Sequence, residues 1–255
     1  MPRVAQHTFG TPAWFDLMTP DAPSARAFYG ALFGWTFDLS GPEYGFYAMA
    51  RRDGTEVAGL GQIPPGNPMP AAWSVYFLAE DADRTATAIT EHGGTLLLGP
   101  HEVGEAGRMI IAKDPTDAVF GVWQPGTHRG AGIVDEHGAM AWCEVNTPNL
   151  ARATAFYSAV FGLESEPMEG LGTPYARLSR DAQVCAGVLQ MNAAWVGVPP
   201  HWMIYFRVDD VAKAVGLVAA LGGRVSHGPF ETPYGRIAIV TDPQGAVFTL
   251  MQRPD

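Results

Sequence analysis

Hydrophobic and polar residues alternate over residues 14–17 and then recur with helical spacing over residues 25–34. The alternation is typical of a strand with one buried face, and the helical spacing predicts an amphipathic helix that ends at Gly34. Three more strand-like stretches and a loop follow, and then the same order begins again. The predicted strands after the first are 36–39, 45–50, 57–63, 73–78, 95–98, 109–113 and 119–123, with a second helix at 81–92 that ends at Gly93-Gly94.

The second half of the chain repeats the first. Residues 13–20, 73–81 and 107–124 match residues 141–148, 202–210 and 235–252 at offsets of 128, 129 and 128. Such self-similarity at a nearly constant spacing indicates that the structural unit is duplicated. It predicts an α+β protein with four strand–helix–strand–strand–strand (βαβββ) modules, two in each half. We expect a first domain at 8–125, a linker at 126–138 and a second domain at 139–253.

Composition narrows the range of functions. The net charge of −10 disfavours nucleic acid as a partner, because such proteins present a basic surface. No apolar run approaches the roughly 20 residues that cross a bilayer, and the first ten residues lack the apolar core of a signal peptide. We therefore expect a cytoplasmic protein with no membrane partner, in which Cys143 and Cys185 are reduced and buried. Two joined copies could replace a dimer, so both a monomer and a homodimer remain open.

Three pairs of sequence motifs, one member in each half, resemble those of a known family. They are ARAFYGALFGW and ARATAFYSAVFGL on the first helix of each half, the stretches at 76–81 and 205–210, and DPTDAVFGVWQ and DPQGAVFTLMQ near the end of each half. Across residues 10–253 the chain resembles the vicinal oxygen chelate (VOC) superfamily of glyoxalases, bleomycin-resistance proteins and extradiol dioxygenases. It is most similar to a two-domain actinobacterial group labelled "putative hydroxylase" or 27-kDa-antigen-like. The resemblance implies paired modules that curl into a cup, which commonly holds a divalent metal and the substrate.

The positions where metal-using relatives carry their ligands hold other residue types here. These positions, found by counting from the Phe-Tyr, Asp-Asp and Asp-Pro motifs, are occupied in the first half by Trp14, Ser74 and Gly121. In the second half they are occupied by Trp142, Met203 and Thr249. Zinc, nickel and iron prefer imidazole or carboxylate ligands. We therefore predict that the usual metal site is absent and that the protein has no cofactor.

Strand alternation indicates what faces each cup instead. Two concave sites are expected, each lined by aromatic residues and methionine around one carboxylate, and such walls suit a flat organic ligand. The residues predicted to bind it are Trp14, Asp16, Ser74, Tyr76, Trp123, Trp142, Asn146, Met203, Thr249 and Met251, and the candidate catalytic residues are Glu144, His201 and Tyr205.

Several of these residues have a structural alternative. The two tryptophans could fill the cups as core residues. Asp16 and Glu144 could be paired with Arg108 and Arg236 or with backbone amides, or could act as a general acid or base. His201 could equally serve a structural role, and His227 is expected in a loop.

Two functions follow from this pattern. The first is a protein that binds a hydrophobic, aromatic small molecule. The alternative is a VOC enzyme that catalyses a lyase, dioxygenase or hydroxylase-type step in secondary metabolism or aldehyde detoxification. Such an enzyme would be metal-free or would use off-pattern ligands such as Glu144 and His201. Asn146, His201 and Thr249 make the second half more polar, so we prefer its cup as the reactive site.

Overall fold

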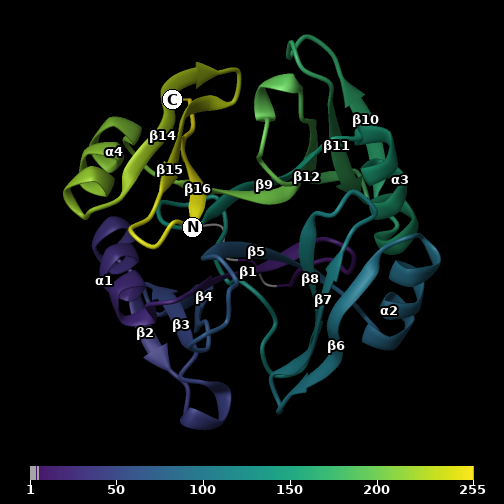
Figure 1. Cartoon of the computed structure of the whole chain (residues 1–255), viewed down its shortest axis with the longest axis horizontal. Helices are drawn as coiled ribbons and strands as arrows, with labels where there is room; N and C mark the ends of the chain where they lie inside the picture. Colours follow the sequence, from purple (N-terminus) through teal and green to yellow (C-terminus); the bar gives the residue numbers. More distant parts are fainter. Residues whose placement is uncertain (1–3, 5, 255) are drawn as a thin grey trace.

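A computed structural model describes residue 4 and residues 6–254 (Figure 1). Its first sheet has eight strands in the order β2-β3-β4-β1-β5-β8-β7-β6, and its second repeats that order as β10-β11-β12-β9-β13-β16-β15-β14. The first-half strands are β1 (Pro12–Thr19), β2 (Thr36–Leu39), β3 (Ala48–Arg52), β4 (Thr55–Gln62), β5 (Ala72–Leu78), β6 (Thr95–Val103), β7 (Gly107–Lys113) and β8 (Val119–Pro125). Those of the second half are β9 (Met140–Thr147), β10 (Glu164–Met168), β11 (Tyr175–Arg180), β12 (Gln183–Gln190), β13 (His201–Arg207), β14 (Arg224–Thr232), β15 (Gly235–Thr241) and β16 (Val247–Gln252).

The helices lie close to their predicted positions, although the first helix begins at Ala22 and not at Ala25. They are α1 (Ala22–Phe33), α2 (Ala82–Glu91), α3 (Leu150–Phe161) and α4 (Val211–Ala220). Asp21 caps α1 by accepting a hydrogen bond from the Ser24 amide at 3.0 Å, and Asn149 does the same for α3 with Arg152. Gly34 ends α1 in the left-handed conformation, at a φ of 72°. The predicted α+β fold of four modules in two domains is thus confirmed, although β6 runs five residues beyond the predicted end at Leu98.

The two halves share one core. Figure 1 shows α1 beside α4 and α2 beside α3, and these helix pairs are in contact. Aromatic rings meet across the boundary: Phe77 stacks on Phe161 with centroids 4.4 Å apart, and Phe33 lies 5.1 Å from Phe206. Such rings bury large apolar areas, so much of the stability comes from the contact between halves.

Reciprocal hydrogen bonds join the halves as well. Tyr29 on α1 donates to the Asp242 carboxylate at 3.0 Å, and Tyr157 on α3 donates to Asp114 at 3.0 Å. Trp73 and Trp202 each donate to the phenolic oxygen of the tyrosine in their own half. The Phe-Tyr motifs and the Asp-Pro turns therefore have a structural role, because the tyrosine of each half donates a hydrogen bond to the aspartate of the other half.

Among the described residues, none of the helices combines the length and the apolar character required to cross a membrane.

Candidate functional site

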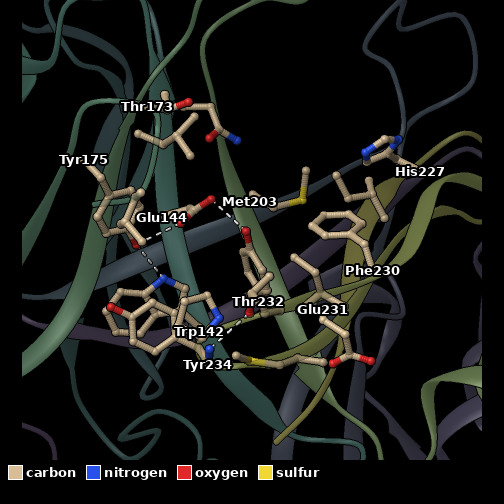
Figure 2. A pocket seen from close by; sticks show the side chains of 18 of the residues that line it. Trp142, Glu144, Thr173, Tyr175, Met203, His227, Phe230, Glu231, Thr232 and Tyr234 are labelled. Carbon is tan, nitrogen blue, oxygen red and sulfur yellow. Dashed lines mark hydrogen bonds between the residues drawn. The ribbon is translucent and has the colours of Figure 1, made fainter. Parts of the chain in front are cut away.

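The second sheet encloses a cavity of about 710 Å³ on its concave face (Figure 2). Strands β9, β11, β13 and β16 supply its inner wall, because alternate residues on these strands point away from the helices. The hairpin between β14 and β15 forms a second wall, with Phe230, Thr232 and Tyr234. The lining is mostly aromatic and aliphatic, which is usual for a site that binds a small organic molecule.

A buried carboxyl lies in the middle of this lining. Glu144 on β9 is only 6% exposed, and its two oxygens accept hydrogen bonds from Tyr175 at 2.9 Å and Tyr205 at 2.7 Å. Trp142 donates its indole N–H to the Tyr175 oxygen at 3.1 Å. Burial raises the pKa of Glu144, and the hydrogen bonds from the two tyrosines only partly oppose this shift.

Sequence reasoning missed Tyr175, although the repeat contained the signal. Tyr47 precedes Tyr175 by 128 positions, and the hydroxyl of each tyrosine lies over a glycine on a neighbouring strand, Gly59 or Gly187. A Cβ atom on either glycine would overlap the tyrosine hydroxyl. The glycine thus provides the space in which the phenol reaches the carboxylate.

The first sheet builds the same arrangement in a closed form. Tyr47 and Tyr76 donate to one oxygen of Asp16 at 3.2 and 3.1 Å, and Trp14 donates to Tyr47 at 3.1 Å. Burial raises the pKa of Asp16 to about 7, against the effect of the hydrogen bonds from Tyr76 and Tyr47. The other oxygen of Asp16 is buried and has no partner among the described residues.

The linker between the domains fills this first cup. The His128 ring lies 4.2 Å from Trp14 and 5.6 Å from Trp123, edge-on to both. Its Nδ1 is 3.0 Å from the Glu56 carboxylate, and Trp123 donates to its backbone oxygen at 2.9 Å. Trp14 and Trp123 are consequently 4% and 6% exposed, so this cup offers a ligand little surface.

The two halves also differ in how deeply the equivalent tyrosines Tyr76 and Tyr205 are buried, because Gly121 in the first half corresponds to Thr249 in the second. The ring of Tyr76 packs directly on Gly121, where any side chain would overlap it, and Tyr76 is 5% exposed. In the second half Thr249 takes the place of that glycine, opposite Tyr205 in the strand register. The Thr249 side chain excludes the position that Tyr76 adopts, and Tyr205 remains partly exposed in the cavity wall.

The structure brings together most of the residues predicted for the second cup. Those that line the cavity are Trp142, Glu144, Asn146, Met203, Tyr205 and Met251. His201, which does not line the cavity, lies beside Asn146 on the next strand, with its ring nitrogens 3.1 Å from the Asn146 amide and 2.8 Å from the Pro199 oxygen. Thr249 is fully buried. The first-half residues Trp14, Asp16, Ser74, Tyr76 and Trp123 belong to the closed cup, where Ser74 pairs with Asp16 across β1 and β5.

One alternative that the sequence offered is wrong. The carboxylates are not paired with the arginines that follow the glycines, because Arg108 binds Asp83 and Glu102 while Arg236 binds Glu231. Asp16 and Glu144 accept from tyrosines instead.

Cavity residues that the sequence did not suggest come mainly from loops and from the hairpin. They include Leu171, Thr173, Trp195, Phe230 and Tyr234. His227, which was expected only in a loop, also lines the cavity, next to Phe230 at a centroid distance of 5.0 Å.

The donor set does not fit the metal centre that the resemblance implies. The three equivalent positions of the open cup hold an indole, a thioether and a hydroxyl, in Trp142, Met203 and Thr249. Across residue 4 and residues 6–254, no group of three or more His, Cys, Asp and Glu side chains could hold a metal ion. Both nitrogens of His201 are already engaged. That the usual metal site is absent stays a prediction until the metal content is measured.

Comparison with known proteins agrees with this architecture. The family model of the Glyoxalase/Bleomycin resistance protein/Dioxygenase superfamily matches residues 11–122 and 139–250. A Mycobacterium tuberculosis protein named "Putative glyoxylase CFP32" is 38% identical over 258 residues, which cover 99% of this chain and 98% of that protein. The "Anthracycline biosynthesis protein DauV" of Streptomyces sp. strain C5 is 36% identical, over 95% of this chain and 93% of that protein.

Solved structures share the fold at much lower identity. The Mn(II)-bound glyoxalase from Novosphingobium aromaticivorans superposes with a TM-score of 0.67 at 15% identity, over 96% of this chain and 82% of that one. The 2,3-dioxygenase LapB from Pseudomonas sp. KL28 gives the same TM-score and identity, over 98% and 96%. At this identity the likeness concerns the fold, and the chemistry has to be argued from the side chains.

Proposed function

The chain belongs to the Glyoxalase/Bleomycin resistance protein/Dioxygenase superfamily, and on that basis we propose that its second half binds a flat, hydrophobic, aromatic small molecule without a metal ion at the usual position. The observation that carries this proposal is the open cavity of about 710 Å³, whose aromatic walls surround one buried carboxyl. Its volume lies within the range of about 300–1,000 Å³ that is typical of small-molecule sites.

The relatives named for anthracycline biosynthesis support an aromatic ligand. Anthracyclines are polycyclic aromatic compounds, and the DauV and DnrV proteins of two Streptomyces are 36% identical to this chain. In this chain the aromatic side chains of Trp142, Tyr175 and Trp195 line the cavity. Aromatic rings attract one another in offset-stacked or edge-on arrangements, with about 0.5–1.5 kcal/mol beyond the buried area.

Tryptophan fluorescence tests the pocket with its own built-in control. The chain has seven tryptophans, of which Trp142 and Trp195 line the cavity, while Trp14 lies in the closed cup. We expect a hydroxylated anthraquinone to quench emission with one saturable site per chain. Trp142→Ala should weaken binding about tenfold, which corresponds to the loss of roughly 1.4 kcal/mol of ring contact. Trp14→Phe should bind as the wild type does. If no polycyclic aromatic quenches, or if both variants bind equally well, the proposal fails.

Metal analysis tests the second part of the proposal. Protein purified without a histidine tag should contain far less than one equivalent of nickel, zinc, iron or manganese, because the three ligand positions offer neither imidazole nor carboxylate. A stoichiometric content that survives dialysis against a chelator would contradict it.

A metal-free enzyme is the second candidate, and the position of Glu144 favours it. Burial raises the pKa of this carboxyl in the wall of the cavity, which is the condition under which a carboxyl can exchange a proton with a bound molecule near neutral pH. Mass spectrometry of the bound compound after incubation separates binding from turnover. A product that forms with the wild type and not with Glu144→Gln supports the enzyme, whereas unchanged compound in both supports binding alone.

A further inference from the structure

Asn146 and His201 form a polar pair that only the second half possesses. They face each other across β9 and β13, and the equivalent cross-strand pair in the first half is Met18 and Ala72. Asn146 is 2% exposed and lines the cavity. A buried amide and imidazole cost stability relative to an apolar pair unless their hydrogen bonds are made. The half with the open cavity is thus the half that carries this pair.

The hydrogen bonds of His201 determine which way the Asn146 amide points. The Nδ1 atom of His201 lies 2.8 Å from the Pro199 carbonyl oxygen, which can only accept, so Nδ1 carries the proton. Burial lowers the pKa of His201, which keeps the ring neutral, and Nε2 therefore offers a lone pair. The Asn146 group 3.1 Å from Nε2 must then be the NH₂ group. This leaves the Oδ1 atom of Asn146 buried and without a partner among the described residues.

The two tyrosines that bond to Glu144 also present acceptors. Tyr175 and Tyr205 both direct their hydroxyl hydrogens to the carboxylate, and the Trp142 N–H is used on Tyr175. Lone pairs of the phenolic oxygens remain, together with Oδ1 of Asn146. An unpaired buried acceptor destabilises the free protein, and a ligand that donates a hydrogen bond to it would recover this cost.

We propose that Asn146 is the specificity-determining residue of the cavity, that its Oδ1 accepts a hydrogen bond from a phenolic or enolic hydroxyl of the ligand, and that His201 holds the amide in this orientation. The inference rests on the proposed function and narrows its ligand class to hydroxylated aromatic compounds. His201 is in this account a positioning residue, since it acts through Asn146.

Two probes that differ in one group test the proposal. In 2-hydroxyanthraquinone the hydroxyl is too far from the quinone oxygens to bond internally, and 2-methoxyanthraquinone has the same ring system without the donor. Calorimetric titration of the wild type should give a dissociation constant about tenfold lower for the hydroxyl compound, the factor that corresponds to roughly 1.4 kcal/mol for one hydrogen bond.

The first half of the chain supplies the matched variant. The double substitution Asn146→Met with His201→Ala installs the pair found at Met18 and Ala72, and so leaves neither partner unsatisfied. The hydroxyl preference, which is the ratio of the two dissociation constants, should fall to about one. His201→Ala alone frees the amide to rotate, so the preference should fall although Asn146 is retained. Thermal denaturation checks that each variant is folded.

The outcomes separate the two proposals. If the wild type binds both probes equally, or if the double variant keeps the tenfold preference, the role of Asn146 is wrong and aromatic binding stands. If neither probe binds to the wild type, the proposed function fails and this inference fails with it. If His201→Ala keeps the full preference, the amide is oriented without the imidazole, and the positioning role is wrong.

Discussion

Asp16 provides a sharp test of how tightly the first cup is closed. Its Oδ2 atom accepts from Tyr47 and Tyr76, and its Oδ1 atom is buried with no partner in the part of the chain that the structure describes. Asp16→Asn keeps one acceptor oxygen for the two phenols and removes the charge. The new NH₂ group replaces the unpaired Oδ1 atom. The free-energy cost of burying it does not change with pH, because an amide does not titrate. A comparison between two pH values therefore isolates the effect of ionisation.

The direction and size of that effect follow from the raised pKa. Burial raises the pKa of Asp16 from 3.8 to about 7, so the folded chain holds the proton more tightly than the unfolded chain does. The stabilisation by the protonated carboxyl is fully present below the unfolded value and is lost as the pH rises through about 7. The loss is about 1.36 kcal/mol for each pH unit between pH 5 and the folded pKa near 7 and is small above it, so the loss between pH 5 and pH 8.5 is about 3 kcal/mol.

Urea denaturation of wild type and Asp16→Asn at these two pH values measures the difference. We expect the variant to gain about 3 kcal/mol of unfolding free energy relative to the wild type when the pH is raised from about 5 to about 8.5. Glu91→Gln, which removes an exposed carboxyl from α2, controls for the change in net charge and should show no such gain. If the difference between Asp16→Asn and the wild type is the same at both pH values, the carboxyl titrates normally and the first cup is open to water.

Two further changes test the contacts around the sites. Tyr29→Phe removes the hydroxyl that donates to Asp242 and accepts from Trp73. The variant should have an unfolding free energy about 1–3 kcal/mol lower than the wild type, with unchanged ligand affinity. An unfolding free energy equal to that of the wild type would contradict a stabilising role. His128→Ala removes the ring that fills the first cup, and calorimetry should then count two bound aromatic ligands per chain in place of one; a constant stoichiometry would mean that Trp14 closes the cup by itself.

The inner wall of the cavity could be predicted from the sequence because it depends on a local property. Alternation along a strand determines which face each side chain occupies, whatever the rest of the chain does. Trp142 and Glu144 on β9 and Met203 and Tyr205 on β13 therefore all lie where the alternation placed them. Tyr175 could have been found too, since the repeat aligns it with Tyr47.

The remaining features depend on how distant segments fold back. Phe230 and Tyr234 reach the cavity only because the β14–β15 hairpin curls over the sheet, and no periodicity encodes that curl. His128 lies in a linker with no counterpart in the repeat, so spacing could not predict that it enters the first cup. Arg108 pairs with acidic residues of its own surface, and competition between several nearby carboxylates is not visible in the sequence.

The closed cup and the shared core together explain why a second copy can take a different role. Tyr29 bonds to Asp242 and Tyr157 bonds to Asp114, so neither half is complete without the other. The first half fills its own cup with His128 and packs apolar residues where the second half has Asn146 and His201. The second half is consequently held by a well-packed neighbour, and it can keep a buried carboxyl and an unpaired amide oxygen that would weaken an isolated domain of its size. Both copies keep a buried carboxyl, Asp16 or Glu144, and only the second adds the Asn146–His201 pair beside an open cavity, so the proposed ligand site belongs to the second copy.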